Sequence, residues 1–398
     1  MLPHHRAART ARACKDGADW LAAGGGDDGR RHSSAARCLV AGTGQWVPLD
    51  PGATEPYLMD PAWQGGRRDE KWWGRCDTDL HTNQSIPASR PARPSLLFTW
   101  EPEGDGCADL RKHRSVLPDL AALACAFCSR WAGRSILFVG DSVQGELFHS
   151  FAHVLGAVSS LAPPTGQVNE ACRAWVEGSG YESDLTVDLC EAGERAVHAR
   201  FVRNEMLWLD NERNGRGRTK GTKLNLPVRV LCEWDAAAAE ADAIVLNRGY
   251  HSLGSEISEL KADLNDTFAG LEALLKARRR HDRPHAPARV VYRGTHASIY
   301  KCAEYADPLQ PSIPGVHAVT HAMHIHRSNA NSWYAWRNVY AHHRLDQDAM
   351  ASMGVTYLNT FTATSLRPGG RLSPQDCNHF CLPGPPDEWT RMLLAFLT

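Results

Sequence analysis

The sequence predicts an α/β fold in which helices cover both faces of a parallel β-sheet. Short apolar runs of strand length alternate along the chain with longer segments whose apolar residues recur at helical spacing. Three of the apolar runs end in polar turns: Gly-Asp-Ser at 140–142, Asn-Arg-Gly-Tyr-His at 247–251 and Arg-Gly-Thr-His at 293–296. Because sites in open parallel sheets form at the carboxyl ends of strands, we expect these turns to line one site.

The expected elements follow from these patterns in chain order. Helices are predicted at 119–131, 143–158, 256–280 and 333–350. Strands are predicted at 136–139, as a pair at 196–202 and 206–210, within 241–252 and 288–298, and finally at 354–364. Residues 1–70 are rich in Gly, Arg, Asp and Ala, so we expect a disordered leader or stem there and a single domain over 71–398.

Composition excludes several classes of protein. The formal net charge is −1 and 22% of residues are charged, so nothing favours a nucleic-acid partner. No run of about twenty apolar residues occurs, and we therefore expect no transmembrane segment in this chain. Twelve scattered cysteines and two N-glycosylation sequons, at Asn83 and Asn265, indicate disulfides and the secretory pathway. The first residues lack the apolar core of a signal peptide, so we expect a signal or anchor to be missing from this sequence.

Two clusters of metal-binding or redox residue types have plainer interpretations. Cys125 and Cys128 have the spacing of a redox pair, but in a predicted helix of a secretory protein a structural role is favoured. Four histidines lie close together, at His317, His321, His324 and His326, yet no nearby carboxylate or cysteine completes a zinc set. We therefore expect no metal ion.

Ser142 stands where a predicted strand meets a predicted helix. One interpretation is an ordinary strand-to-helix turn with a polar cap, and the other is a nucleophile presented at the end of a strand. A serine nucleophile needs a histidine base, which a carboxylate usually orients. Asp376 and His379 lie three residues apart, close to Cys377 and Cys381, a spacing that fits such a pair and equally fits a disulfide-bonded surface turn.

The motifs together resemble one known family. "ILFVGDS" and "DCNHFCLPGPPDEW" resemble the paired GDS and DxxH signatures of the trichome-birefringence-like, PC-esterase family of polysaccharide O-acetyltransferases. "TWEPEGDGC", "VLNRGYHS", "VVYRGTHAS" and "LNTFTATSLRPGGRLSPQDC" resemble further segments of that family in the same order. The resemblance covers roughly residues 70–398, and the block around His379 is its most specific part.

The resemblance implies an SGNH-hydrolase-like fold with disulfide-tied loops and a catalytic triad of Ser142, His379 and Asp376. The oxyanion hole would use the backbone N–H of Ser142 together with Asn247 and Gly249, while Asp141 would brace the turn. Cys377 and Cys381 would each bond a remote cysteine, with Cys302 expected for one and Cys76 or Cys107 for the other.

The chain departs from the family pattern beside these residues. The family typically reads GDS-x-x-R-N, whereas Gly145 and Glu146 stand at the last two positions, and Phe380 replaces a tryptophan in the DxxH block. Candidate substrate-binding residues follow the other two polar turns, and the two arginines would favour an acidic sugar: Arg248, His251, Arg293 and His296.

The resemblance implies an O-acetyltransferase that passes an acetyl group from Ser142 to a polysaccharide hydroxyl in the Golgi lumen. The acetyl donor, acetyl-CoA or another acetyl ester, is left open, and no bound cofactor is expected. Two alternatives use the same residues differently: an acetylesterase that transfers the acetyl group to water, and an inactive glycan-binding protein.

Overall fold

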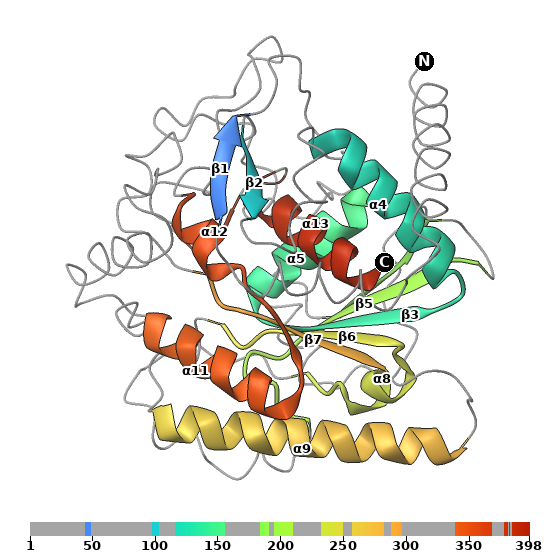
Figure 1. Ribbon diagram of the computed structural model, residues 1–398. Helices are drawn as coiled ribbons and strands as arrows, with labels where there is room; N and C mark the ends of the chain where they lie inside the picture. The colour runs from blue at the N-terminus through green and yellow to red at the C-terminus, as the bar shows by residue number, and fades with distance from the viewer. Residues whose placement is uncertain are drawn as a thin grey trace, which may run out of the picture.

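A central mixed sheet organises the described part of the chain. The computed structural model describes residues 44–48, 98–102, 116–155, 184–190, 195–209, 232–249, 257–281, 288–296, 339–367, 378–380, 382 and 384–398. Its six-stranded sheet has the order β4 (Asp184–Leu189), β5 (Val197–Arg203), β3 (Ser135–Gly140), β6 (Ala243–Leu246), β7 (Arg289–Arg293) and β8 (Thr356–Leu358) (Figure 1).

Within this six-stranded sheet, all strand pairings except one are parallel. Strand β3 pairs in parallel with β5 on one side and β6 on the other, and β7 and β8 continue in the same direction. Edge strand β4, which periodicity did not predict, pairs antiparallel with β5. The carboxyl ends of β3, β6 and β7 therefore lie side by side at one edge, which confirms the predicted α/β class.

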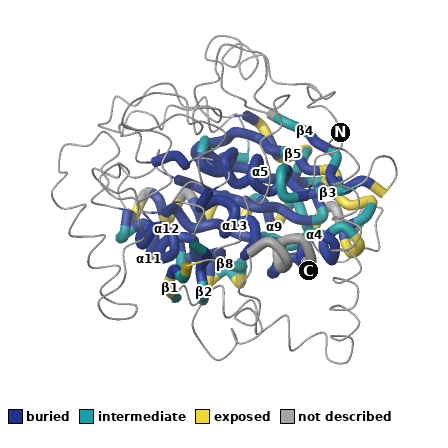
Figure 2. The backbone as a smooth tube through the Cα atoms, turned by 90° about the horizontal axis from the view of Figure 1, so that it is seen from above, coloured by how far each residue is buried: buried dark blue, intermediate teal, exposed yellow. Residues whose placement is uncertain are grey.

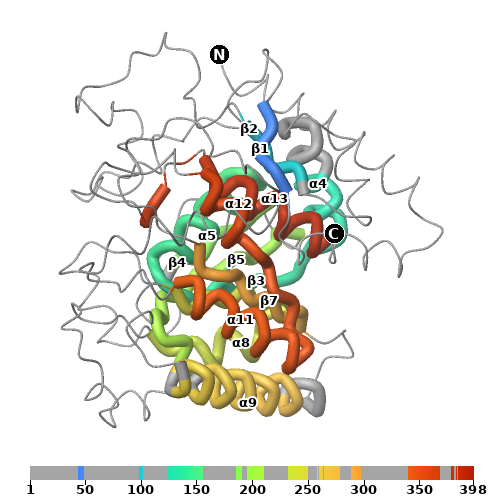
Figure 3. The backbone as a smooth tube through the Cα atoms, turned by 60° about the vertical axis from the view of Figure 1, so that its left-hand side comes forward, coloured from blue at the N-terminus to red at the C-terminus, as the bar shows by residue number. Residues whose placement is uncertain are grey.

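Helices form a layer on each face of the sheet. Helices α4 (Val116–Trp131), α5 (Ser142–Val154) and α13 (Pro385–Leu397) cover one face, and α8 (Asp235–Glu240), α9 (Ile257–His281) and α11 (Val339–Met353) cover the other (Figures 1 and 3). Alternate residues of β3 face opposite layers: Phe138 joins the core under α5 and α13, and Val139 joins the core over α9 and α11. Helix α5 is buried along nearly its whole length (Figure 2).

A small two-stranded sheet packs beside the first layer. Strand β1 (Gly44–Pro48) pairs antiparallel with β2 (Phe98–Pro102), and Trp46 is only 4% exposed. The indole Nε1 of Trp46 donates to the carbonyl oxygen of Ala363 at 2.8 Å. Strand β1 falls inside the 1–70 segment predicted as a leader or stem, so that boundary leaves out one strand of the folded unit.

One strand prediction is wrong and another is too long. Residues 206–209 form no strand; Leu207 has a φ of 58°, and the Asn204 side chain bonds both the N–H and the carbonyl of Trp208. The predicted final strand ends at Leu358 and is followed by helix α12 (Phe361–Ser365). The Asn359 Oδ1 accepts the Phe361 N–H at 3.1 Å, which caps this short helix.

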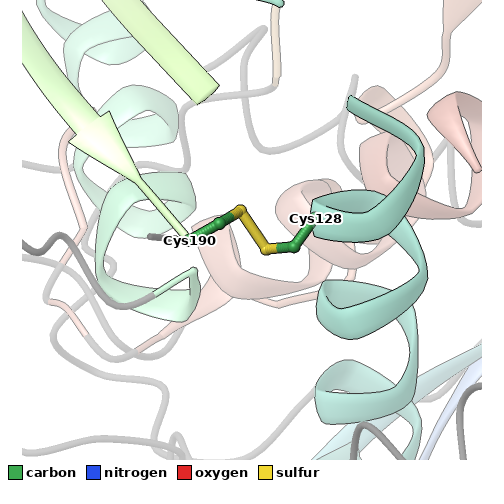
Figure 4. Close-up of a disulfide and its surroundings, with 2 residues drawn as sticks. All are labelled: Cys128 and Cys190. Atoms are coloured by element: carbon green, nitrogen blue, oxygen red, sulfur yellow. A yellow bond between two sulfur atoms is a disulfide. The ribbon is translucent and has the colours of Figure 1, made fainter. Parts of the chain in front are cut away.

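A disulfide between Cys128 and Cys190 links α4 to the end of β4 (Figure 4). Cys125 is also disulfide-bonded, and not to Cys128, which confirms the structural interpretation of this cysteine pair. The predicted bridges of Cys377 and Cys381 lie outside the described residues. No helix in the described ranges is both long and apolar enough to cross a membrane.

Candidate active site

Helix α5 begins with Ser142, directly after strand β3. The Asp141 carboxylate caps the helix, because its Oδ1 accepts the N–H groups of Val143 and Gln144 at 3.0 and 3.2 Å. The Asp141 carbonyl accepts the N–H of Gly145 at 3.1 Å. Asp141 thus accepts the N–H groups of Val143, Gln144 and Gly145. The N–H of Ser142, the remaining donor of the first turn, can therefore donate to an acceptor outside the helix.

Ser142 and His379 meet across 237 residues of sequence. The Ser142 Oγ lies 2.7 Å from the Nε2 of His379, and the pair is only partly buried. For Nε2 to accept the serine proton, the imidazole must carry its own proton on Nδ1. Asp376, the predicted partner of that Nδ1 proton, lies outside the described residues.

The Asn247–Gly249 turn packs against the start of α5. A Cβ added at Gly249 would come within 2.0 Å of Asp141 Oδ2, so only glycine allows this approach. The Asn247 side-chain amide donates to the carbonyl oxygen of Arg293 at 2.9 Å, which joins the exits of β6 and β7. The two predicted oxyanion residues and Ser142 therefore belong to one packed unit at the sheet edge.

Three of the four candidate substrate-binding residues are buried in the framework. Arg293 is 1% exposed; its guanidinium donates to Gln144 Oε1 at 2.9 Å and to the Gly294 carbonyl at 3.0 Å. His296 is fully buried, with its Nε2 2.8 Å from the Asn378 carbonyl, and Arg248 is 2% exposed. This burial favours positioning roles over direct contact with a sugar, while His251 lies outside the described residues.

Gln144 is a residue of the site that motif reasoning passed over. Its Nε2 donates to the Val245 carbonyl at 2.9 Å and its Oε1 accepts from Arg293, so one side chain ties α5 to both β6 and β7. In the sequence, the only hint of this role was that Gln144 is a polar residue among the apolar residues of α5. The Arg203–Glu205 ion pair, at 2.7 Å, is a second buried polar feature at this edge, following β5.

Buried titratable groups lie on the other side of the sheet, on α11 and the strands it covers. Burial raises the pKa of Asp346 to about 8, although Tyr292 and Arg248 oppose this shift. Burial, with a smaller contribution from Arg248, lowers the pKa of His342 to about 4. His343, whose pKa burial also lowers to about 4, contacts the hydroxyl of Tyr357 through Nδ1 at 2.8 Å. Within the described ranges, no group of three or more His, Cys, Asp or Glu side chains could hold a metal ion.

The arrangement of strand, serine and helix, with a histidine brought from the far end of the chain, defines an α/β protein of the SGNH-hydrolase type. A model of the PC-Esterase family, described as a GDSL/SGNH-like acyl-esterase family found in Pmr5 and Cas1p, matches residues 298–396. The matched segment includes His379 and ends within helix α13. Ser142 precedes this segment and is not part of it.

Two relatives extend this match. Protein trichome birefringence-like 42 of Arabidopsis thaliana is 22% identical over 334 residues, which cover 77% of this chain and 79% of that protein. Protein trichome birefringence-like 9 of the same plant is 34% identical over 74 residues, 16% of this chain and 18% of that protein. The chain is thus similar to trichome-birefringence-like proteins over most of its length, and its C-terminal quarter matches a family of acyl-esterases.

Proposed function

We propose that this chain is an O-acetyltransferase that moves an acetyl group through acyl-Ser142 onto a polysaccharide hydroxyl. The observation that carries the proposal is the 2.7 Å contact between Ser142 Oγ and His379 Nε2 at the carboxyl edge of the sheet. A serine hydroxyl at a helix start, with an unprotonated imidazole nitrogen in hydrogen-bond reach, is the arrangement that nucleophilic acyl transfer requires.

In the first half-reaction, Ser142 Oγ attacks the carbonyl carbon of the acetyl donor while its proton moves to His379 Nε2. The oxyanion that forms accepts hydrogen bonds from the Ser142 N–H and from the Asn247–Gly249 turn. A well-placed donor there stabilises the transition state by about 3 kcal/mol. His379 then returns the proton to the leaving group, and Asp376 holds the imidazolium in place.

In the second half-reaction, His379 removes the proton of a sugar hydroxyl, whose oxygen attacks the acyl carbon. The bond from that carbon to Ser142 Oγ then breaks, and His379 gives the proton to the serine oxygen. The donor is an acetyl ester or thioester, with acetyl-CoA as one option, and no bound cofactor takes part. We place this reaction in the secretory pathway, in the Golgi lumen, where the Cys128–Cys190 disulfide is stable.

An acetylesterase is the second candidate, because the matching family is described as acyl-esterases. It shares the acyl-enzyme and differs only in using water as the acceptor. An inactive glycan-binding protein is the third, and the close Ser142–His379 contact argues against it.

The deciding experiment loads the oxidised, folded protein briefly with an aryl acetate. Acetyl-free xylan, mannan or pectin oligosaccharides are then added separately, and mass spectrometry follows both enzyme and sugar. Transfer predicts that one oligosaccharide becomes acetylated and speeds the loss of acetyl from the enzyme. Loss to water at the same rate with every sugar would replace this proposal with the esterase.

A further inference from the structure

Glu146 occupies a position where a buried carboxyl group is unexpected. It lies one helical turn after Ser142 on α5, and its side chain is fully buried. Its Oε1 accepts the backbone N–H of Phe380 at 2.8 Å. Phe380 directly follows His379, so a residue of the serine helix holds the chain immediately next to the base.

A second contact holds the other side of the same histidine. The imidazole of His296, after strand β7, lies with Nε2 2.8 Å from the carbonyl oxygen of Asn378. The backbone of Asn378 is thus hydrogen-bonded to a residue that follows β7, and the backbone of Phe380 to a residue of α5. His379 lies between these two anchors, with its Nε2 2.7 Å from Ser142 Oγ.

The ring of Phe380 adds packing to this arrangement. It is fully buried, with ring centroids 5.1 Å from His296 and 5.5 Å from Trp389 of α13. These aromatic contacts hold the Phe380 ring in place. The Glu146 bond restrains the backbone itself, and the backbone sets where the His379 imidazole points.

We propose that Glu146 is a positioning residue: by accepting the Phe380 N–H, it keeps His379 Nε2 within proton-transfer distance of Ser142 Oγ. The proposal rests on the proposed acyl transfer through Ser142. Buried acceptors are costly to lose, and misplacing a base by about 1 Å lowers rates by about 100-fold.

The test compares Glu146→Ala, Glu146→Gln and Glu146→Asp in the full chain. Glutamine keeps an acceptor oxygen at the same reach, aspartate keeps the acid but shortens the side chain, and alanine removes both. Glu388→Ala is the matched control, because Glu388 is a buried carboxylate that binds Thr99 and Arg391 away from the Ser142–His379 pair.

Two readouts separate positioning from general structure: kcat and KM for an aryl acetate, and hydrogen exchange of the Phe380 amide. We expect Glu146→Ala and Glu146→Asp to lower kcat by about 10- to 100-fold with KM unchanged, and to speed Phe380 exchange. Glu146→Gln should restore both values. Glu388→Ala should lower the midpoint of unfolding and leave both readouts near wild type.

Wild-type kcat and Phe380 exchange in Glu146→Asp would overturn the proposal, as would a glutamine variant as impaired as alanine. If alanine fails to fold, the comparison of glutamine with aspartate decides alone. If no protein, wild type included, hydrolyses the ester while Phe380 exchange still separates the variants as expected, the contact stands and the proposed function fails.

Discussion

The two helix layers each bury a carboxyl group, and the surroundings of these two groups differ. In the layer of α5 and α13, the carboxylate of Asp387 accepts hydrogen bonds from Ser150 at 2.6 Å and from the Gly384 N–H at 2.7 Å. In the layer of α11, Asp346 is buried with a pKa raised to about 8. Asp387 in the first layer is therefore held by two short hydrogen bonds, whereas Asp346 in the second is an acid whose charged form burial disfavours.

The two layers differ in how closely they are connected to the Ser142–His379 pair. The first layer carries Ser142 on α5, and α13 follows directly after the His379 segment, so its hydrogen bonds fix the reacting atoms. The second layer supports the strands from behind and contributes no group to the Ser142–His379 pair. We expect changes in the first layer to affect catalysis or rigidity and changes in the second to affect how stability depends on pH.

The largest expected effect comes from removing the base. His379→Ala should lower the rate of Ser142 acetylation by about 10³-fold or more, because the serine proton then has no acceptor. Burst kinetics with an aryl acetate measure this rate. His198→Ala, which removes a half-exposed histidine bonded to Asp188, is the control and should keep the wild-type rate. An equal loss in both variants would contradict the assignment.

Replacing the buried acid of the second layer should change the pH dependence of stability. The folded pKa of Asp346 is about 8 against an unfolded value of 3.8, so the folded state binds the extra proton between these values. Stability from this group is therefore present at low pH and is lost as pH rises toward 8. From pH 6.5 to 8 the loss is roughly 2 kcal/mol. His342 and His343, with lowered pKa values of about 4, are largely neutral in the folded state across that window.

Asp346→Asn should remove this loss. Urea unfolding of the oxidised protein at several pH values between 6.5 and 8.5 measures it. Parallel pH profiles for wild type and variant would show that the Asp346 proton does not control stability. The second layer would then not set how stability depends on pH.

The smallest expected effect lies in the first layer, away from the reacting atoms. Ser150→Ala removes a donor to Asp387 and the contact with Thr390 at 2.7 Å. It should lower the free energy of unfolding by about 1 to 2 kcal/mol. Urea unfolding at one pH measures the change, and kcat should stay close to wild type. A loss of kcat without a loss of stability would mean that α13 controls the site more directly than its hydrogen bonds indicate.

The sequence predicted the elements whose periodicity is strong. The strand at 136–139 and the helices at 119–131 and 256–280 match β3, α4 and α9 closely, because core packing sets those patterns. The second half of the predicted strand at 354–364 was misleading because threonine favours strands. In α12, however, the hydroxyls of Thr364 and Ser365 each bond a backbone carbonyl four residues earlier, at 2.6 Å, and the helix forms.

The candidate site was predictable only where a motif named it. Ser142 and His379 are 237 residues apart, and only the resemblance paired them before the structure brought them to 2.7 Å. Charge alone made Arg293 a candidate for binding an acidic sugar, yet its guanidinium is used inside the protein by Gln144. Glu146 was noted as a departure, but its contact with Phe380 depends on tertiary packing that no local pattern encodes.

The most direct test of the account is to locate the acetyl group on the protein. Wild type and Ser142→Ala are exposed briefly to an aryl acetate, digested and sequenced by tandem mass spectrometry. The account predicts acetyl on Ser142 in the wild type, none on Ser150 of the same helix, and no labelled serine in the variant. Equal labelling of both proteins at another residue would contradict Ser142 as the nucleophile.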